Sequence, residues 1–266
     1  MEYETVIFDK TDQVATITLN RPNKLNAVSS RMLLEIYQII ENIRDNGSIR
    51  FVIITGSGRA FSSGIDLGEH GQAIEQGQKY FTAYGRRRQK FGHSFMRSLD
   101  ELDQVTIAAL NGITLGAGLA LALACDFRIA ATEASLGIPE VNTGIFFTWG
   151  CTPRLVRLVG PAKAKELIMT GRIVSAGESL NLGLVNKVVP LGELMTTCHQ
   201  LIATIAARAP LAIRTTKMIV NAVSTPAIGD VGFYEPDLVE RLDSTLDRAE
   251  AINAFLQKRQ PRFSGE

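Results

Sequence analysis

Two glycine-rich segments constrain this chain most strongly, because each follows an apolar stretch and precedes a predicted helix. The first covers residues 55–67 (TGSGRAFSSGIDL) and the second residues 111–120 (NGITLGAGLA). Glycine lets a backbone approach a ligand closely, and the free N–H groups of a helix N-terminus favour negative charge. Neither segment has the glycine spacing of a nucleotide-binding loop. Each alone could be an ordinary turn, but two converging amides would form an oxyanion hole.

The segments around these loops alternate between predicted strands and predicted helices. Strand-like apolar runs occur at residues 6–8, 14–19, 51–54, 105–110 and 127–130. A helix is predicted up to about Arg44, with Ser29 or Ser30 as its cap. One long polar helix or a pair of helices is predicted over residues 69–102. This order predicts an α/β fold with a mainly parallel sheet.

The length and charge of the chain limit its organisation. A chain of 266 residues suits one domain, or one domain with an appendage. We expect an α/β core over residues 1–200 and a helical region over residues 201–266. The net charge of +1 favours neither nucleic acid nor an anionic membrane. The longest apolar stretch, residues 115–125, is too short to cross a bilayer, and the N-terminus lacks a signal-peptide pattern. We therefore expect a cytoplasmic protein without nucleic-acid or membrane partners.

The cysteines indicate neither a disulfide framework nor a metal site. Cys125, Cys151 and Cys198 are odd in number, and no two of them have metal-ligand spacing. We expect free thiols in a reducing compartment and no bound metal.

Glu140 is the carboxylate best suited to proton transfer. It lies among apolar neighbours in the segment GIPEV at residues 137–141. Partial desolvation there would raise its pKa toward the range that is useful for a general base. A structural glutamate paired with a cation is the alternative.

Taken together, these segments resemble the enoyl-CoA hydratase/isomerase (crotonase) family. The resemblance covers nearly the whole chain through ordered motifs at residues 20–27, 60–67, 111–118, 124–126, 137–140, 155–160, 170–172, 183–189 and 255–259. It implies a spiral of ββα units with a helical C-terminal trimerisation region, assembled as a homotrimer or a dimer of trimers. It also implies an enzyme acting on acyl-CoA thioesters, with no cofactor other than the coenzyme A that the substrate carries.

The resemblance also assigns the catalytic groups. In the family two backbone amides hold the thioester oxygen, and they fall here on Ile65 and Ala117. Glu140 matches the acid/base carboxylate. The two amides would stabilise the enolate, where negative charge develops.

Several further residues match the family's coenzyme A contacts. The Lys24 side chain is expected to reach the coenzyme's phosphates. The backbones of Leu25, Ser63 and Asp66 are expected to line the adenine and pantetheine channel. Two residues near the C-terminus match positions that bind the coenzyme of a neighbouring subunit, namely Phe255 and Lys258.

One departure from the hydratase pattern affects the predicted reaction. Hydratases of the family commonly use two glutamates around one water, and the first of these positions is Ala120 here. A single base can still move a proton between two carbons, so the sequence favours an enoyl-CoA isomerase that performs a 1,3 proton shift. A hydratase, a thioester or C–C hydrolase of the same superfamily, and a non-catalytic coenzyme A-binding protein are the alternatives, in that order.

The acyl pocket itself is predicted from residues around Glu140 and on the preceding helix. Phe146 and Trp149 suggest a bulky apolar floor, although ordinary core packing would explain them equally well. Thr148 lies where some relatives carry a catalytic aspartate. Tyr84 and His93 could each donate a hydrogen bond to the substrate. The run of arginines at residues 86–88 is more typical of a solvated face than of a phosphate site.

Overall fold

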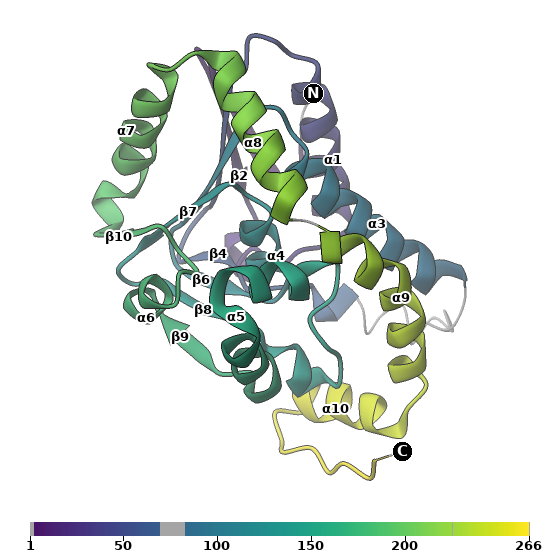
Figure 1. The fold of residues 1–266 in the computed structure, drawn as a ribbon. Coiled ribbons are helices and arrows are strands. Elements are labelled where there is room, and N and C mark those ends of the chain that lie inside the picture. Colours follow the sequence, from purple (N-terminus) through teal and green to yellow (C-terminus); the bar gives the residue numbers. More distant parts are fainter. Residues whose placement is uncertain (1–2, 70–82, 225, 266) are drawn as a thin grey trace.

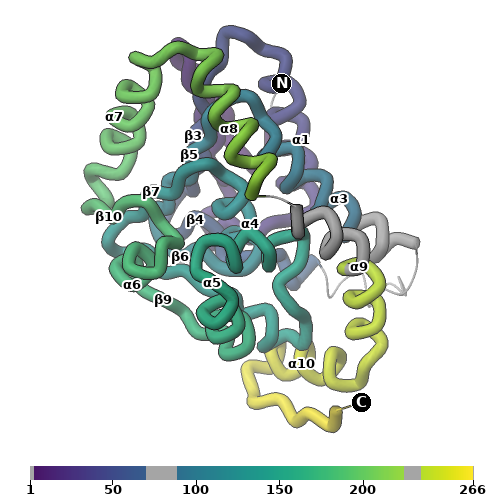
Figure 2. The backbone as a smooth tube through the Cα atoms, in the orientation of Figure 1, coloured from purple at the N-terminus to yellow at the C-terminus, as the bar shows by residue number. Residues whose placement is uncertain are grey.

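The computed structural model describes residues 3–69, 83–224 and 226–265, without the side chains of residues 83–88 and 226–234. Figure 1 shows a central twisted sheet surrounded by helices, with the C-terminal helices α9 and α10 along one side. Figure 2 traces the same path as a tube. No helix in the described part of the chain is both long and apolar enough to cross a membrane.

The main sheet runs through the middle of the molecule. Among the described residues its strand order is β1-β2-β3-β5-β7-β10. These strands are β1 (Val6–Thr11), β2 (Val14–Leu19), β3 (Phe51–Gly56), β5 (Val105–Leu110), β7 (Phe127–Ala131) and β10 (Lys187–Val189). The β1–β2 pair is antiparallel, and the neighbouring pairs from β2 to β10 are parallel. This confirms the predicted α/β class with its mainly parallel sheet.

A second, smaller sheet lies beside the first. It has the order β4-β6-β8-β9, formed by β4 (Ala60–Ser62), β6 (Ile113–Leu115), β8 (Ser135–Gly137) and β9 (Ile173–Ser175). The sequence predicted both glycine-rich segments as loops throughout, which was wrong for β4 and β6. Both strands are only three residues long and depend on their neighbours, as when Asn26 Nδ2 donates to the Ala60 carbonyl at 2.7 Å.

The two sheets together produce the repeating unit of the fold. β3 and β4, β5 and β6, and β7 and β8 each pair a strand of the main sheet with a short strand of the second sheet. The second pair is followed by α4 (Ala117–Leu123) and the third by α5 (Cys151–Thr170). This is the expected succession of ββα units.

Both faces of the main sheet are covered, as strand β3 shows. Its side chains alternate between two cores: Val52 and Ile54 belong to one, Phe51 and Ile53 to the other. Helix α1 (Ser30–Arg44) packs in the first core, and α7 (Leu194–Ala206) packs in the second. Ser29 caps α1 as predicted, because its Oγ accepts from Met32 N at 3.1 Å.

The remaining helices are α3 (Ala83–Asp100), α6 (Ala176–Asn181), α8 (Pro210–Ser224), α9 (Pro226–Asp243) and α10 (Leu246–Leu256). Of these, α3, α9 and α10 contribute residues to the site described below. Helix α9 packs along α3, and α10 packs against the 3-10 turn η2 (Pro139–Thr143). Figure 1 shows α9 beside α3, and α10 following at the end of α9. The C-terminal region is helical as expected, while its division from the core at residue 200 and its role in trimerisation stay predictions.

Candidate active site

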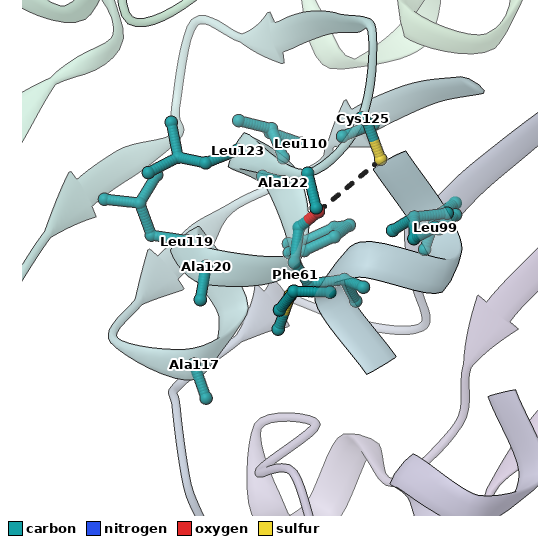
Figure 3. Packing of buried hydrophobic residues seen from close by; sticks show 14 of the residues in the cluster. Phe61, Leu99, Leu110, Ala117, Leu119, Ala120, Ala122, Leu123 and Cys125 are labelled. Carbon is teal, nitrogen blue, oxygen red and sulfur yellow. Dashed lines mark hydrogen bonds between the residues drawn. The ribbon is translucent and has the colours of Figure 1, made fainter. Parts of the chain in front are cut away.

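The ends of the two glycine-rich segments lie against each other. A Cβ on Gly64, whose φ is +99°, would lie 3.7 Å from Ala117 N. A Cβ on Gly118 would lie 2.7 Å from Ser62 Cβ, so the start of α4 packs directly on β4. Figure 3 shows Ala117 and Ala120 on α4 among the surrounding buried side chains. The absence of side chains at these glycines therefore brings the two segments into contact.

The amides of Ile65 and Ala117 are unpaired at this junction. Within the described residues neither N–H donates to a protein acceptor. The chain around Ile65 is nevertheless fixed, since Val28 N donates to the Gly64 carbonyl at 2.7 Å and Asp66 N donates to the Val28 carbonyl at 3.0 Å. Ala117 is the first residue of α4, where helix N–H groups lack intrahelical partners. Both amides are therefore held in place and free to bind an oxygen.

The carboxyl group of Glu140 lies next to this pair of amides. Glu140 is the second residue of η2, and a Cβ on Gly116 would lie 2.6 Å from Glu140 Oε1. Its Oε2 is buried and has no hydrogen-bond partner. Burial raises the pKa of Glu140 to about 7, because the charged form is poorly solvated there. This carboxyl group can thus accept and return a proton near neutral pH.

One pocket joins these groups to the predicted acyl site. Its lining consists of Ile65, Leu67, Gln89, Ala117, Ala120, Glu140, Thr143, Ile145, Phe146, Phe147, Thr148, Trp149, Val239, Asp243 and Arg248. The structure therefore brings the residues predicted as catalytic together with Phe146, Thr148 and Trp149. The methyl group of Ala120 occupies the place where the family's first glutamate was expected.

Trp149 has an unusual backbone conformation. Its φ is +60°, which is rare for a large side chain. The indole packs on α3 at Gly92, where a Cβ would lie 2.4 Å from Trp149 Nε1. Because Gly92 has no side chain, the indole ring can pack against α3 at this position and form part of the pocket wall.

The two other predicted pocket residues have different outcomes. His93 was a candidate hydrogen-bond donor to the substrate, but it is not part of the pocket lining. Its Nε2 lies instead 2.5 Å from Oε2 of Glu235, a residue of α9 whose side chain is fully buried. The side chain of Tyr84, like those of the arginines at 86–88, lies outside the described residues.

Four of the predicted coenzyme-binding residues lie together beside the first glycine-rich segment. Lys24 ends the 3-10 turn Pro22–Lys24 and is exposed. Ser63 N donates to the Leu25 carbonyl at 2.9 Å, which joins this turn to the segment after β4. Asp66 accepts from Arg21 Nη2 at 2.8 Å. These contacts hold the four residues together where the 3-10 turn meets the segment after β4, and we call this surface the rim. The exposed Lys24 side chain can extend outward from it.

The two predicted residues near the C-terminus are exposed. Phe255 lies near the end of α10 with 52% of its surface accessible, and Lys258 follows the helix with φ of +53°. Neither belongs to the pocket lining of this chain. Their contribution to a neighbouring subunit's coenzyme remains a prediction.

The sequence did not reveal four residues of this region. Asp243 and Arg248 line the pocket from the C-terminal helices, where Arg248 Nε donates to Asp243 Oδ1 at 3.0 Å. Gln89 lines it from α3, and Glu235 supports its wall by accepting from Gly150 N at 3.1 Å. No local pattern marks these positions, because each contacts segments that are distant in sequence.

The fold and the pocket define an α/β enzyme built from crotonase-type ββα units. The family model for enoyl-CoA hydratase/isomerase matches residues 9–266. The short-chain-enoyl-CoA hydratase of Clostridium acetobutylicum is 38% identical over 260 residues, covering 97% of each chain. This chain therefore belongs to the enoyl-CoA hydratase/isomerase family of acyl-CoA-processing enzymes.

Solved structures of similar proteins agree with this assignment. An enoyl-CoA hydratase from Mycobacterium avium subsp. paratuberculosis superposes with a TM-score of 0.87 at 25% identity, covering 99% of this chain and 100% of that chain. A monofunctional enoyl CoA isomerase from M. smegmatis has a TM-score of 0.70 at 31% identity, covering 84% and 95% respectively. The family contains both reactions, so family membership alone does not choose between them.

Proposed function

We propose that this chain is an enoyl-CoA hydratase in which Glu140 transfers the proton between water and C2 of a 2-enoyl thioester. The observation that carries the proposal is the position of the Glu140 carboxyl group. It is buried, lacks a partner on Oε2 and lies against Gly116, beside the unpaired amide of Ala117. An acid/base group next to an oxyanion site is the arrangement that enolate chemistry requires.

The two amides act on the thioester oxygen. Ile65 N–H and Ala117 N–H donate to that oxygen as electrons move onto it from the C2=C3 double bond. Each donor contributes about 3 kcal/mol if it is aimed at the charge of the transition state. Because that charge is largest in the enolate, the amides favour the transition state over the bound substrate.

Glu140 completes the addition of water in two steps. As the water oxygen bonds to C3, the carboxylate takes one of the water's protons, and the thioester becomes an enolate. The neutral carboxyl group then donates that proton to C2, and the carbonyl is restored. A pKa of about 7 suits a group that must act in turn as base and acid near neutral pH.

The coenzyme A part of the substrate is proposed to bind along the rim formed by Lys24, Leu25, Ser63 and Asp66. Lys24 is exposed and would pair with phosphate, while the backbone of the other three would contact the pantetheine and adenine. The proposal needs no cofactor beyond this coenzyme. It also includes self-association through the C-terminal helices, with Phe255 and Lys258 contributing to a neighbouring subunit's coenzyme.

Hydration is placed first because of the relatives, which reverses the order suggested by Ala120. The Clostridium acetobutylicum protein that matches nearly the whole chain is named as a hydratase. The isomerase remains the second candidate, since Ala120 leaves Glu140 as the only glutamate in the pocket lining among the described residues.

Product analysis separates the two candidates. The purified protein is incubated with 2-enoyl- and 3-enoyl-CoA thioesters of several chain lengths, and the products are identified by mass spectrometry. A hydratase adds one water to the 2-enoyl substrate and leaves the thioester intact. Conversion of a 3-enoyl to a 2-enoyl thioester, without any hydration, would replace the hydratase by the isomerase.

A further inference from the structure

Three residues of the pocket lining each carry a buried polar atom that has no hydrogen-bond partner within the described structure. These atoms are Gln89 Oε1, Glu140 Oε2 and Trp149 Nε1. A buried polar atom without a partner costs about 1–3 kcal/mol. Three such atoms around one pocket therefore indicate that a polar molecule binds there and completes their hydrogen bonds.

The positions of the residues carrying these atoms support a common guest. Gly92 follows Gln89 by three residues on α3, so the two positions lie on the same side of the helix. A Cβ on Gly92 would lie 2.4 Å from Trp149 Cδ1 and Nε1 and 2.5 Å from Cε2, so the nitrogen-containing part of the indole ring packs on that side of α3. Glu140 faces the same pocket from η2.

The hydrogen-bonding capacities of the three atoms match a water molecule. A carboxylate oxygen and an amide carbonyl oxygen each accept one hydrogen bond, and an indole N–H donates one. Water has two hydrogens and two lone pairs, and buried waters typically make about three hydrogen bonds. A water held in this way keeps one lone pair free, which is the lone pair that attack on C3 needs.

We propose that Gln89 is a catalytic residue that holds the reacting water together with Glu140, in place of the second carboxylate that Ala120 cannot supply. Trp149 Nε1 is the third contact of this water. The proposal rests on the hydratase function proposed above. The water-holding role that the family pattern gives to a glutamate on α4 would therefore belong here to a residue of α3.

The chemistry of an amide gives this arrangement a definite proton path. The Gln89 carbonyl accepts a hydrogen bond from the water but is too weak a base to take the proton. The proton removed from water therefore goes to Glu140, and the same carboxyl group returns it to C2. Atoms balance, because the water oxygen ends on C3, one water proton ends on C2 and the other stays on the new hydroxyl group.

The test compares two reactions of one variant. Gln89→Ala is expected to lower kcat for hydration of a 2-enoyl-CoA roughly 100-fold, the effect of a misplaced reactant. The exchange of C2 protons of 3-butenoyl-CoA with D2O needs Glu140 and the two amides but no attacking water. We expect that exchange to stay within about threefold of the wild-type rate.

Matched variants define the control and the rescue. Gln200→Ala changes an exposed glutamine on α7 and should leave both reactions unchanged. Gln89→Glu keeps an acceptor at the same place and should regain at least about tenfold of the hydration rate lost in Gln89→Ala.

Each outcome decides the proposal. Loss of hydration with retained exchange supports it. Equal loss of both reactions would show that Gln89 only supports the pocket, and unchanged hydration would show that it does not hold the water; either result overturns the proposal. If the wild-type protein exchanges C2 protons but hydrates no 2-enoyl-CoA, the hydratase function itself fails, and this role for Gln89 falls with it.

Discussion

Gly116 lies directly against the carboxyl group of Glu140. A Cβ at position 116 would lie only 2.6 Å from Glu140 Oε1. Any larger residue at position 116 would displace the carboxyl group or the start of α4. Gly116 also has a φ of +51°, which side chains other than glycine adopt at a cost.

Gly116→Ala is therefore expected to lower kcat by about 100-fold, because the acid/base group is moved by a substantial fraction of an ångström. Binding of the coenzyme part should change little, and isothermal titration with free coenzyme A can check this. Gly192→Ala is the control, since a Cβ there meets nothing within 4 Å. Full activity of Gly116→Ala would mean that the carboxyl position is not critical.

Glu140→Gln should lower turnover by at least about 100-fold while leaving coenzyme binding nearly unchanged. The amide keeps the size of the side chain but cannot carry the proton. Glu133→Gln, at an exposed position, is the control. Steady-state kinetics with a 2-enoyl-CoA provide the measurement, and an active Glu140→Gln enzyme would remove Glu140 from the mechanism.

The pH dependence of activity should follow the Glu140 carboxyl group. As the pH falls through about 7, this group takes up a proton and can no longer act as the base. We expect kcat/KM for hydration to decrease below pH 7 and to approach a tenfold loss per pH unit. A profile that stays flat from pH 5 to pH 8 would contradict the assignment.

The free energy of unfolding should also depend on the Glu140 carboxyl group, but in the opposite direction from activity: it should fall as the pH rises. Burial raises the pKa of Glu140 from its ordinary value of 4.5 to about 7, so the folded state favours the protonated form. The stability linked to this proton is complete below pH 4.5 and is lost as the pH rises through about 7. Thermal unfolding should show Glu140→Gln gaining Tm relative to the wild type at pH 8 but not at pH 4.5. An equal difference in Tm at both pH values would argue against the raised pKa.

His93 should act in stability rather than in turnover. Its Nε2 lies 2.5 Å from Glu235 Oε2, and this contact joins α3 to α9. We expect His93→Ala to lower the free energy of unfolding by about 2 kcal/mol, because the buried Glu235 carboxylate loses one of its partners and retains the hydrogen bond from Gly150 N. Urea unfolding measures this loss, with the exposed His199→Ala as control. Unchanged stability combined with a large loss of kcat would instead return His93 to the substrate site.

Lys24 should contribute mainly to substrate binding. Lys24→Ala is expected to raise KM for an acyl-CoA by about fivefold, the effect of one exposed ion pair of about 1 kcal/mol, and to change kcat little. The effect should shrink as salt is added, because exposed charges are screened. Lys165→Ala removes another exposed lysine, on α5, and should have no such effect.

Much of the local structure could be read from the sequence. The predicted strands at residues 14–19 and 105–110 coincide with β2 and β5, because their apolar residues are buried in the sheet. The cap and the buried face of α1 also follow from local pattern. Strands β4 and β6 were not predicted, because three residues between glycines are too few to show the alternation of apolar and polar side chains that indicates a strand.

The sequence by itself indicated the family, since each motif that carries the resemblance is a short run of neighbouring residues. Through that resemblance it also predicted the ββα order and the candidate site residues Glu140, Ile65 and Ala117. Only the tertiary structure decided that Gln89 and Arg248 line the pocket and that His93 is paired with Glu235. The physical reason is separation in sequence: His93 and Glu235 are 142 residues apart. Side chains so far apart in sequence come into contact only when the C-terminal helices pack on the core, so no local sequence pattern can predict the contact.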